Sequence, residues 1–92
     1  MKIKFEIQLN EKWIRKEPEE YPVWFTSYIG QVEGLTVANA TLKEEEIMLL
    51  KIEINIDKSL VNEEPNSYFG FFNGFINQIA GLTVLKATLE EE

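Results

Sequence analysis

The chain repeats itself at an offset of 47 residues, and this repeat constrains the fold more than any other feature of the sequence. The segment Gly-Leu-Thr-Val at 34–37 occurs again at 81–84. Pairing residues 1–45 with 48–92 without a gap makes 19 of the 45 pairs identical. Because a unit of 47 residues could hardly bury enough surface to be stable alone, we expect both copies to share one core. Residues 1–92 are therefore predicted to form a single domain made of two tandem halves.

Both copies predict the same three elements. Residues 2–10 and 49–57 alternate between apolar and polar side chains, which is typical of a half-buried strand. A helix follows in each copy, because apolar residues recur at i, i+4, i+7, i+8 and i+11. These stripes are Tyr21, Phe25, Tyr28, Ile29 and Val32 in the first copy, and Tyr68, Phe72, Phe75, Ile76 and Ile79 in the second. A period of two then returns and predicts a closing strand in each half.

Local signals place the ends of these elements. Gly34 and Gly81 are predicted to be C-cap glycines, and Asn66 or Ser67 to cap the second helix. Pro22 is expected in the first turn of the first helix, where its missing N–H costs little. The apolar pairs Trp13-Ile14 and Leu60-Val61 in the connections are expected to fold back over an edge of the core. The closing strand is expected to place Thr36, Ala38, Ala40 and Leu42 on one side, and the corresponding segment of the second copy to set Leu85 and Leu89 around Ala87.

The element order strand, helix, strand, strand, helix, strand has one compact solution with right-handed crossovers. We expect an α+β, ferredoxin-like βαββαβ sandwich, with a four-stranded antiparallel sheet in the order 4-1-3-2 and both helices on one face. Its internal two-fold axis lies between the first and third strands. The paired residue numbers there should add up to 57, which sets Lys4 opposite Glu53 and Glu6 opposite Lys51.

Composition argues against several functions. The chain has 9 Lys+Arg against 16 Asp+Glu, a formal charge of -7, which opposes direct nucleic-acid binding. The outward positions of the two central strands hold no aromatic residue to stack bases. There is no Cys and no His, so thiolate and imidazole chemistry are absent. Acidic runs lie at element ends without the spacing of a calcium loop. We therefore predict no catalytic, cofactor-binding or metal-binding residue.

Two observations bear on localisation. The start of the chain lacks the apolar region and cleavage site of a signal peptide, and the absence of Cys favours the cytoplasm. Residues 68–85 are free of charge, but Asn73, Asn77 and Gln78 interrupt them. We expect no membrane span.

The outer faces of the two helices are the least ordinary feature, because solvent-facing helices normally carry Lys, Arg and Glu. From Tyr21 to Thr36 the only charged residue is Glu33, and 65–85 has none. Interior glycines each cost about 0.5–1 kcal/mol relative to Ala. We predict an interface there, made of Val23, Trp24, Ser27, Gly70, Phe71, Asn73, Gly74 and Asn77. A face that simply meets water and a lipid-binding surface are the other two interpretations.

The favoured function is a small acidic, non-enzymatic protein–protein interaction module, adaptor-like or inhibitor-like, whose helices dock a protein partner or a second copy. One alternative is a regulatory module that binds a small ligand at a dimer interface, which rests on fold analogy alone. Another is an inhibitor that mimics nucleic acid on a basic protein. An enzyme using loop carboxylates around Trp13 or Tyr21 has less support. A designed symmetric scaffold is disfavoured by Pro22 and the glycine-rich second helix.

Overall fold

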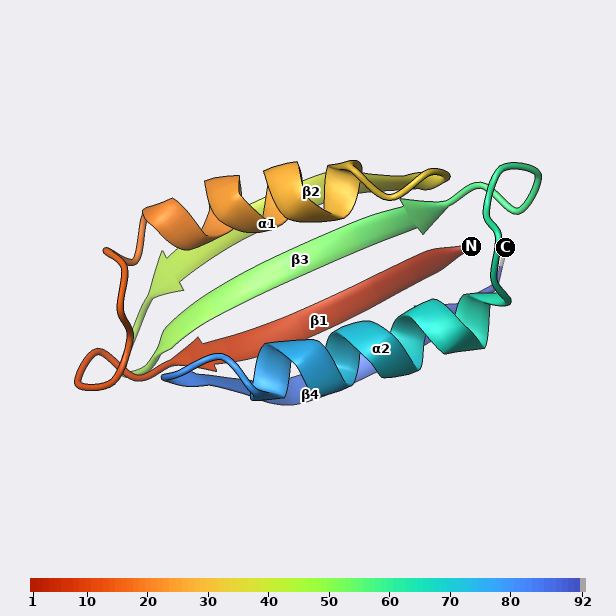
Figure 1. The fold of residues 1–92 in the computed structure, drawn as a ribbon. Coiled ribbons are helices and arrows are strands. Elements are labelled where there is room, and N and C mark those ends of the chain that lie inside the picture. Colours follow the sequence, from red (N-terminus) through yellow and green to blue (C-terminus); the bar gives the residue numbers. More distant parts are fainter. Residues whose placement is uncertain (92) are drawn as a thin grey trace.

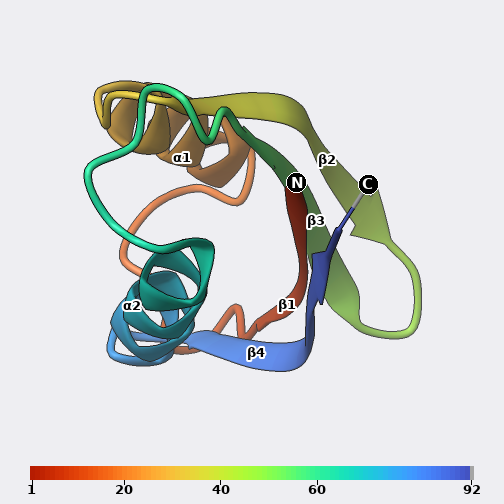
Figure 2. The same cartoon turned by 90° about the vertical axis from the view of Figure 1, so that its right-hand side faces the viewer.

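A computed structural model describes residues 1–91 as one four-stranded sheet with two helices. The elements in chain order are β1 (Lys2–Leu9), α1 (Glu20–Gly30), β2 (Leu35–Glu44), β3 (Met48–Ile56), α2 (Pro65–Asn77) and β4 (Leu82–Glu90). The sheet is antiparallel throughout, in the order β2-β3-β1-β4. Both helices lie on the same face of the sheet (Figures 1 and 2). The α+β class, the element order and the strand order predicted from the sequence are confirmed.

The central strands β1 and β3 pair in the predicted register. Lys4 lies opposite Glu53, and Glu6 lies opposite Lys51. The Nζ atom of Lys4 is 3.6 Å from Oε1 of Glu53 and 3.2 Å from Oε2 of Glu90 on the other neighbouring strand. The hydrogen bond and charge of Glu90, helped by Glu53, raise the pKa of Lys4 above its usual value. Unlike charges across the open face of the sheet thus favour this register over a one-residue slip.

The core lies between the sheet and the helices. Alternate residues of β1 and β3 are buried, as their period of two predicts. Each helix buries three residues of its predicted stripe, and the other two are partly buried, although the last of them, Val32 or Ile79, lies just beyond the helix. Fully burying one such side chain stabilises the fold by about 1.5–3 kcal/mol. The buried set is Ile3, Phe5, Ile7, Leu9, Tyr21, Phe25, Ile29, Leu35, Leu50, Ile52, Ile54, Ile56, Tyr68, Phe72, Ile76 and Leu82.

The edge strands β2 and β4 each contain a bulge that the sequence analysis missed. The register against β3 shifts between Val37 and Asn39, so Ala38 has no opposite partner. The register against β1 shifts between Val84 and Lys86, which leaves Leu85 extra. One extra residue reverses the phase of a strand. The predicted uninterrupted alternation over 36–42 is therefore wrong.

The bulges also change which side chains reach the core. Val37 before the bulge and Leu42 after it both pack against the core, whereas Thr36 and Ala38 are exposed. Leu85 was expected beside Ala87 at the core, yet 49% of its surface is exposed. The two bulges lie 47 residues apart, at equivalent places in the two edge strands.

The predicted helix caps are wrong. α1 ends at Gly30 and α2 ends at Asn77, several residues before Gly34 and Gly81. α2 begins at Pro65 after Glu64, and no side chain donates or accepts a capping hydrogen bond there, so neither Asn66 nor Ser67 is the cap. Pro at the first helical position explains this start, because its φ is already helical. Pro22 does lie in the first turn of α1, as predicted.

Gly34 and Gly81 instead occupy tight turns between a helix and the next strand. The N–H of Leu35 donates to the carbonyl of Val32 at 3.1 Å, and the N–H of Leu82 donates to that of Ile79 at 3.1 Å. The glycine stands third in each turn, with φ of +89° at Gly34 and +84° at Gly81. Only glycine adopts such a φ without strain, as a turn of this kind requires.

Two crossover loops, residues 10–19 between β1 and α1 and residues 57–64 between β3 and α2, join a strand to a helix. Each of these glycines contacts the crossover loop of the opposite half. A Cβ on Gly34 would be 2.5 Å from Cγ1 of Val61, and a Cβ on Gly81 would be 2.6 Å from the backbone nitrogen of Ile14. The N–H of Asn10 donates to the Gly81 carbonyl at 2.7 Å, and that of Asp57 donates to the Gly34 carbonyl at 2.9 Å. The sequence repeat is thus accompanied by reciprocal contacts between the halves.

The apolar pairs in the crossover loops divide between core and surface. Ile14 and Val61 pack against the core, as expected. Trp13 is 67% exposed and Leu60 is 50% exposed, so the first member of each pair does not cover the core.

Replacing Gly81 with Ala should strongly destabilise the fold. The new Cβ clashes with the backbone at Ile14, and the positive φ adds strain of roughly 1–3 kcal/mol. We expect the free energy of unfolding in urea to fall by at least that amount. Gly30→Ala is the matched control, because among the described residues no atom outside its own turn of the helix lies within 4 Å of its Cβ position. Equal stability of the two variants would contradict the reciprocal contact.

The carboxylate of Asp57 should titrate below its ordinary range. The hydroxyl of Ser59 donates to Oδ1 of Asp57 at 2.6 Å, and the Ser59 N–H donates to the same oxygen at 3.0 Å. These bonds favour the charged form and lower the pKa of Asp57 from 3.8. Its contribution to stability is therefore present above the ordinary pKa and is lost as the pH falls through the lowered one. In an NMR titration, Ser59→Ala should move the midpoint back up; an unchanged midpoint would show that the hydroxyl is not the cause.

Candidate interaction surface on the helix layer

The two helices run antiparallel over the sheet, each above a different edge (Figures 1 and 2). α1 contacts β2 and β3, and α2 contacts β4. The contacts between α1 and α2 are made by large aromatic side chains.

Four nearly parallel rings form a row across the space between the helices. Trp24 and Tyr28 of α1 stack with their centroids 5.5 Å apart and an interplanar angle of 6°. Tyr28 then stacks on Phe75 of α2 at 5.2 Å and 15°. Phe75 stacks on Phe71 at 6.0 Å and 5°. Trp24 also stacks directly on Phe75, at 6.2 Å and 20°, so these three rings all contact one another and Phe71 alone extends beyond them. We call Trp24, Tyr28, Phe75 and Phe71 the aromatic row.

The structure separates the two aromatic residues of the predicted interface. Trp24 is partly buried in the row, and the ammonium of Lys16 lies 5.9 Å from the centre of its ring. Trp24 is thus already partly covered by its own chain. Phe71 is 57% exposed at the other end of the row. Val23, one residue before Trp24, is 68% exposed.

The small residues of the predicted interface point to open space. Ser27, Gly70 and Gly74 are exposed. A Cβ built on Gly70 or Gly74 meets no atom within 4 Å among residues 1–91. Neither glycine is needed for close packing inside the monomer, so its cost to the helix has no explanation there.

The two asparagines of the predicted interface are less available. Asn77 donates from Nδ2 to the carbonyl of Asn73 at 3.0 Å and accepts the N–H of Val84 at 2.9 Å. Its side chain therefore ties α2 to β4 beside the bulge. Asn73 is partly buried. Asn77 has a structural task, which the sequence analysis did not foresee.

A hollow of about 380 Å³ opens beside Phe71. It lies where the segment after α1 approaches the first turns of α2 and is mostly apolar, with one carboxylate. Its lining residues are Val32, Glu63, Ser67, Tyr68, Phe71 and Phe72. Sequence reasoning missed the parts played by Lys16 and Glu63, although their positions 47 residues apart were a signal that could have linked them.

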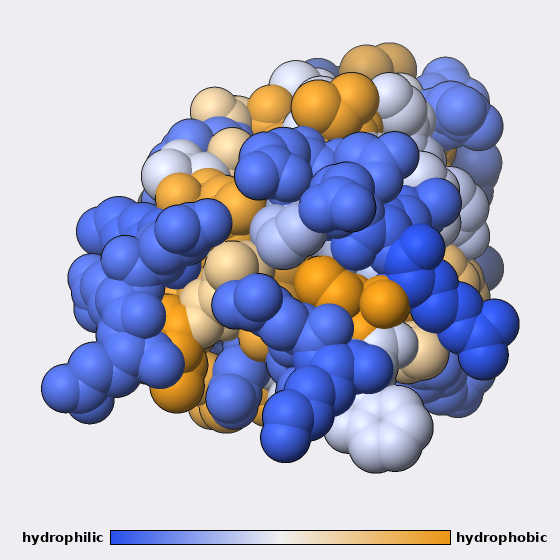
Figure 3. Space-filling view, turned by 90° about the vertical axis from the view of Figure 1, so that its left-hand side faces the viewer, coloured by the Kyte–Doolittle hydropathy of each residue, from blue (hydrophilic) through white to orange (hydrophobic). Residues whose placement is uncertain are grey.

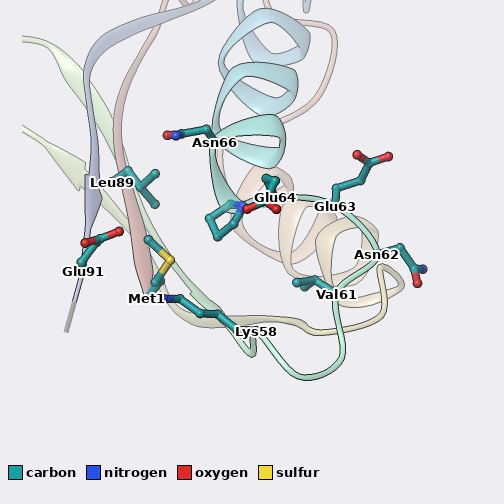
Figure 4. Close-up of a pocket in the computed structure, with 10 residues that line it drawn as sticks. Met1, Lys58, Val61, Asn62, Glu63, Glu64, Asn66, Leu89 and Glu91 are labelled. Atoms are coloured by element: carbon teal, nitrogen blue, oxygen red, sulfur yellow. The ribbon is translucent and has the colours of Figure 1, made fainter.

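Three larger hollows lie elsewhere on the surface. One of about 700 Å³ lies between the loop before α2, the start of the chain and the end of β4, and its lining includes Glu63, Glu64, Glu91 and Lys58 (Figure 4). A second, of about 500 Å³, lies on the sheet face away from the helices, and its lining includes Lys and Glu from neighbouring strands. A third, of about 530 Å³, is lined by residues that include Gly34, Asp57 and Lys58. Within residues 1–91, no group of three or more acidic, His or Cys side chains is close enough together to hold a metal ion.

The end of the molecule that carries the first crossover loop, at the left in Figure 1, has a mainly hydrophilic surface with small apolar patches (Figure 3).

None of the helices described over residues 1–91 is long and apolar enough to cross a membrane.

Rings stacked across the helix layer should be energetically coupled. In a double-mutant cycle of Tyr28→Leu and Phe75→Leu, we expect a coupling energy of about 0.5–1.5 kcal/mol in urea unfolding. Phe69 offers a control, because it stacks on Phe5 at 6.1 Å outside the row. A Tyr28/Phe69 cycle should give a much smaller coupling; equal values in both cycles would contradict a continuous row.

No protein-family model, no curated protein and no solved structure matches this chain.

Proposed function

We propose that the chain is a small, acidic, non-enzymatic interaction module of ferredoxin-like fold, which docks a protein partner or a second copy through the outer faces of α1 and α2. One observation carries this proposal: both helices expose a face without any charged residue, on which Val23 and Phe71 are 68% and 57% exposed. Helices that only meet water normally carry charges there. The module needs no cofactor, and a chain without Cys suits the cytoplasm.

The origin of the fold by internal duplication is part of the proposal. It is supported by bulges at Ala38 and Leu85, by positive-φ glycines at 34 and 81, and by the reciprocal loop contacts. All three pairs of features keep the offset of 47 residues.

The glycines of α2 support a docking role. Helix propensity favours Ala over Gly by about 0.5–1 kcal/mol, and Gly70 and Gly74 have room for a Cβ. A partner that approaches the helix closely would account for both. The formal charge of -7 favours a partner with a basic surface, since opposite charges speed encounter and select orientation.

Gly74→Glu tests the proposal. The side chain has space in the monomer, so circular dichroism and thermal unfolding should stay close to wild type. Association, measured as self-association by sedimentation or as binding of a partner identified by co-purification, should weaken at least tenfold because a charge would be buried without a counterion. Thr36→Glu, which adds the same charge on β2, is the control and should bind normally. Unchanged association of Gly74→Glu would mean that this face only meets water.

Gly74→Ala should have two opposed effects. The free energy of unfolding should rise by up to about 1 kcal/mol through helix propensity. Association should weaken, because a methyl group intrudes on a close contact. A gain in stability without any loss of association would argue against close approach at this glycine.

A further inference from the structure

The two ends of the aromatic row differ in what covers them. At the Trp24 end, Nζ of Lys16 lies 5.9 Å from the ring centre, within the range of a cation–π contact. At the Phe71 end, the ring is 57% exposed and borders the 380 Å³ hollow. One end of the row thus has a cation from its own chain, and the other end is open.

Comparing the two copies shows that Phe71 has no counterpart of the lysine that covers Trp24. Phe71 follows Trp24 by 47 residues, and Glu63 follows Lys16 by the same number. The place of the lysine is therefore taken by a carboxylate, which lines the hollow together with Phe71. Among the described residues, no Lys or Arg lines this hollow. An aromatic ring and a carboxylate therefore line one hollow, and no cationic side chain of residues 1–91 lines it with them.

The chemistry of the lining selects an occupant. An anion would be repelled by Glu63, and a neutral apolar group would remove water from that carboxylate without pairing it. A cation with an apolar stem satisfies both parts, since its stem can lie against Val32 and Phe72 while its charge meets Glu63 and the ring. Arginine fits better than lysine, because a planar guanidinium can stack on a ring and also pair with a carboxylate.

We propose that this hollow receives an arginine side chain of a partner polypeptide, whose guanidinium stacks on Phe71 and pairs with Glu63. The proposal rests on the proposed function in that the partner docks on the same helix layer. It adds the chemical identity of one contact, and it repeats between two chains what Lys16 and Trp24 do within one.

The test uses N-acetyl-arginine methylamide as the probe, titrated into the ¹⁵N-labelled full chain and followed by NMR. We expect saturable shifts around Val32, Glu63 and Phe71 with a Kd in the millimolar range, which is about 4 kcal/mol of binding free energy. N-acetyl-norleucine methylamide, which has a neutral apolar side chain, should bind at least several-fold more weakly. Equal shifts from both compounds would overturn the proposal, because the hollow would then be merely apolar. Tighter binding of the matching lysine compound would overturn the choice of arginine.

Variants locate the contact. Glu63→Lys reverses the charge in the hollow and Phe71→Leu removes the ring while keeping an apolar side chain, so both should abolish the shifts. Glu64→Lys makes the same charge change at the neighbouring residue and should keep them, because Glu64 lines only the larger hollow (Figure 4), whereas Glu63 lines both hollows. Equal loss in both lysine variants would indicate general charge attraction and refute the site.

This result is separable from that of the docking proposal. If Gly74→Glu abolishes association but the arginine probe causes no shifts, the helix interface stands and the arginine site is wrong. If the probe binds as expected and Gly74→Glu associates normally, the site stands and docking across the glycines is wrong.

Discussion

The reciprocal contact between each positive-φ glycine and the opposite crossover loop is the constraint on which the rest of the arrangement depends. Gly34 lies beneath Val61 and Gly81 beneath Ile14, with a backbone hydrogen bond beside each contact. These contacts fix where each helix gives way to an edge strand. They also fix the crossover loops, and through them the starting points of α1 and α2. A side chain at either glycine would move a loop, a helix and an edge strand together.

The helix layer follows from this placement. Because α1 and α2 sit over different edges of the sheet, the space between them is filled by long rings and not by small residues. Stacked aromatic pairs contribute about 0.5–1.5 kcal/mol beyond their buried area. The aromatic row therefore stabilises the pair of helices, and the outer faces of the helices do not take part in this packing. Glycine is tolerated on those faces for the same reason.

Much of the fold could be predicted from the sequence because its signals were repeated and periodic. The alternation in β1 and β3, the first four residues of each helical stripe and the register sum of 57 were confirmed. Val32 and Ile79, the last residues of the stripes, lie beyond the ends of the helices. The bulges could not be predicted, since Ala38 and Leu85 look like ordinary strand residues and only pairing with a neighbour reveals the extra residue. The helix caps failed because Gly34 and Gly81 are required by a turn and a distant loop.

The candidate surface was predicted less completely than the fold. The lack of charge on the helices is visible in the sequence, and the exposure of Val23 and Phe71 agrees with it. The contact between Lys16 and Trp24 could not be predicted, because Lys16 lies in the loop before α1 and no sequence pattern predicts the conformation of that loop. The same holds for Asn77, whose hydrogen bond to Val84 lies beside the bulge of β4.

The pairing of Lys2 with Glu90 has a topological consequence. It places the two ends of the described chain beside each other, as Glu44 and Met48 are placed beside each other by the turn between β2 and β3. A short linker joining the first pair, with a cut between the second, would give a circularly permuted chain in the order β3, α2, β4, β1, α1, β2. That order is again strand, helix, strand, strand, helix, strand. The element order therefore does not distinguish the two halves, and in the permutant the glycine-rich helix would precede the proline-containing one along the chain.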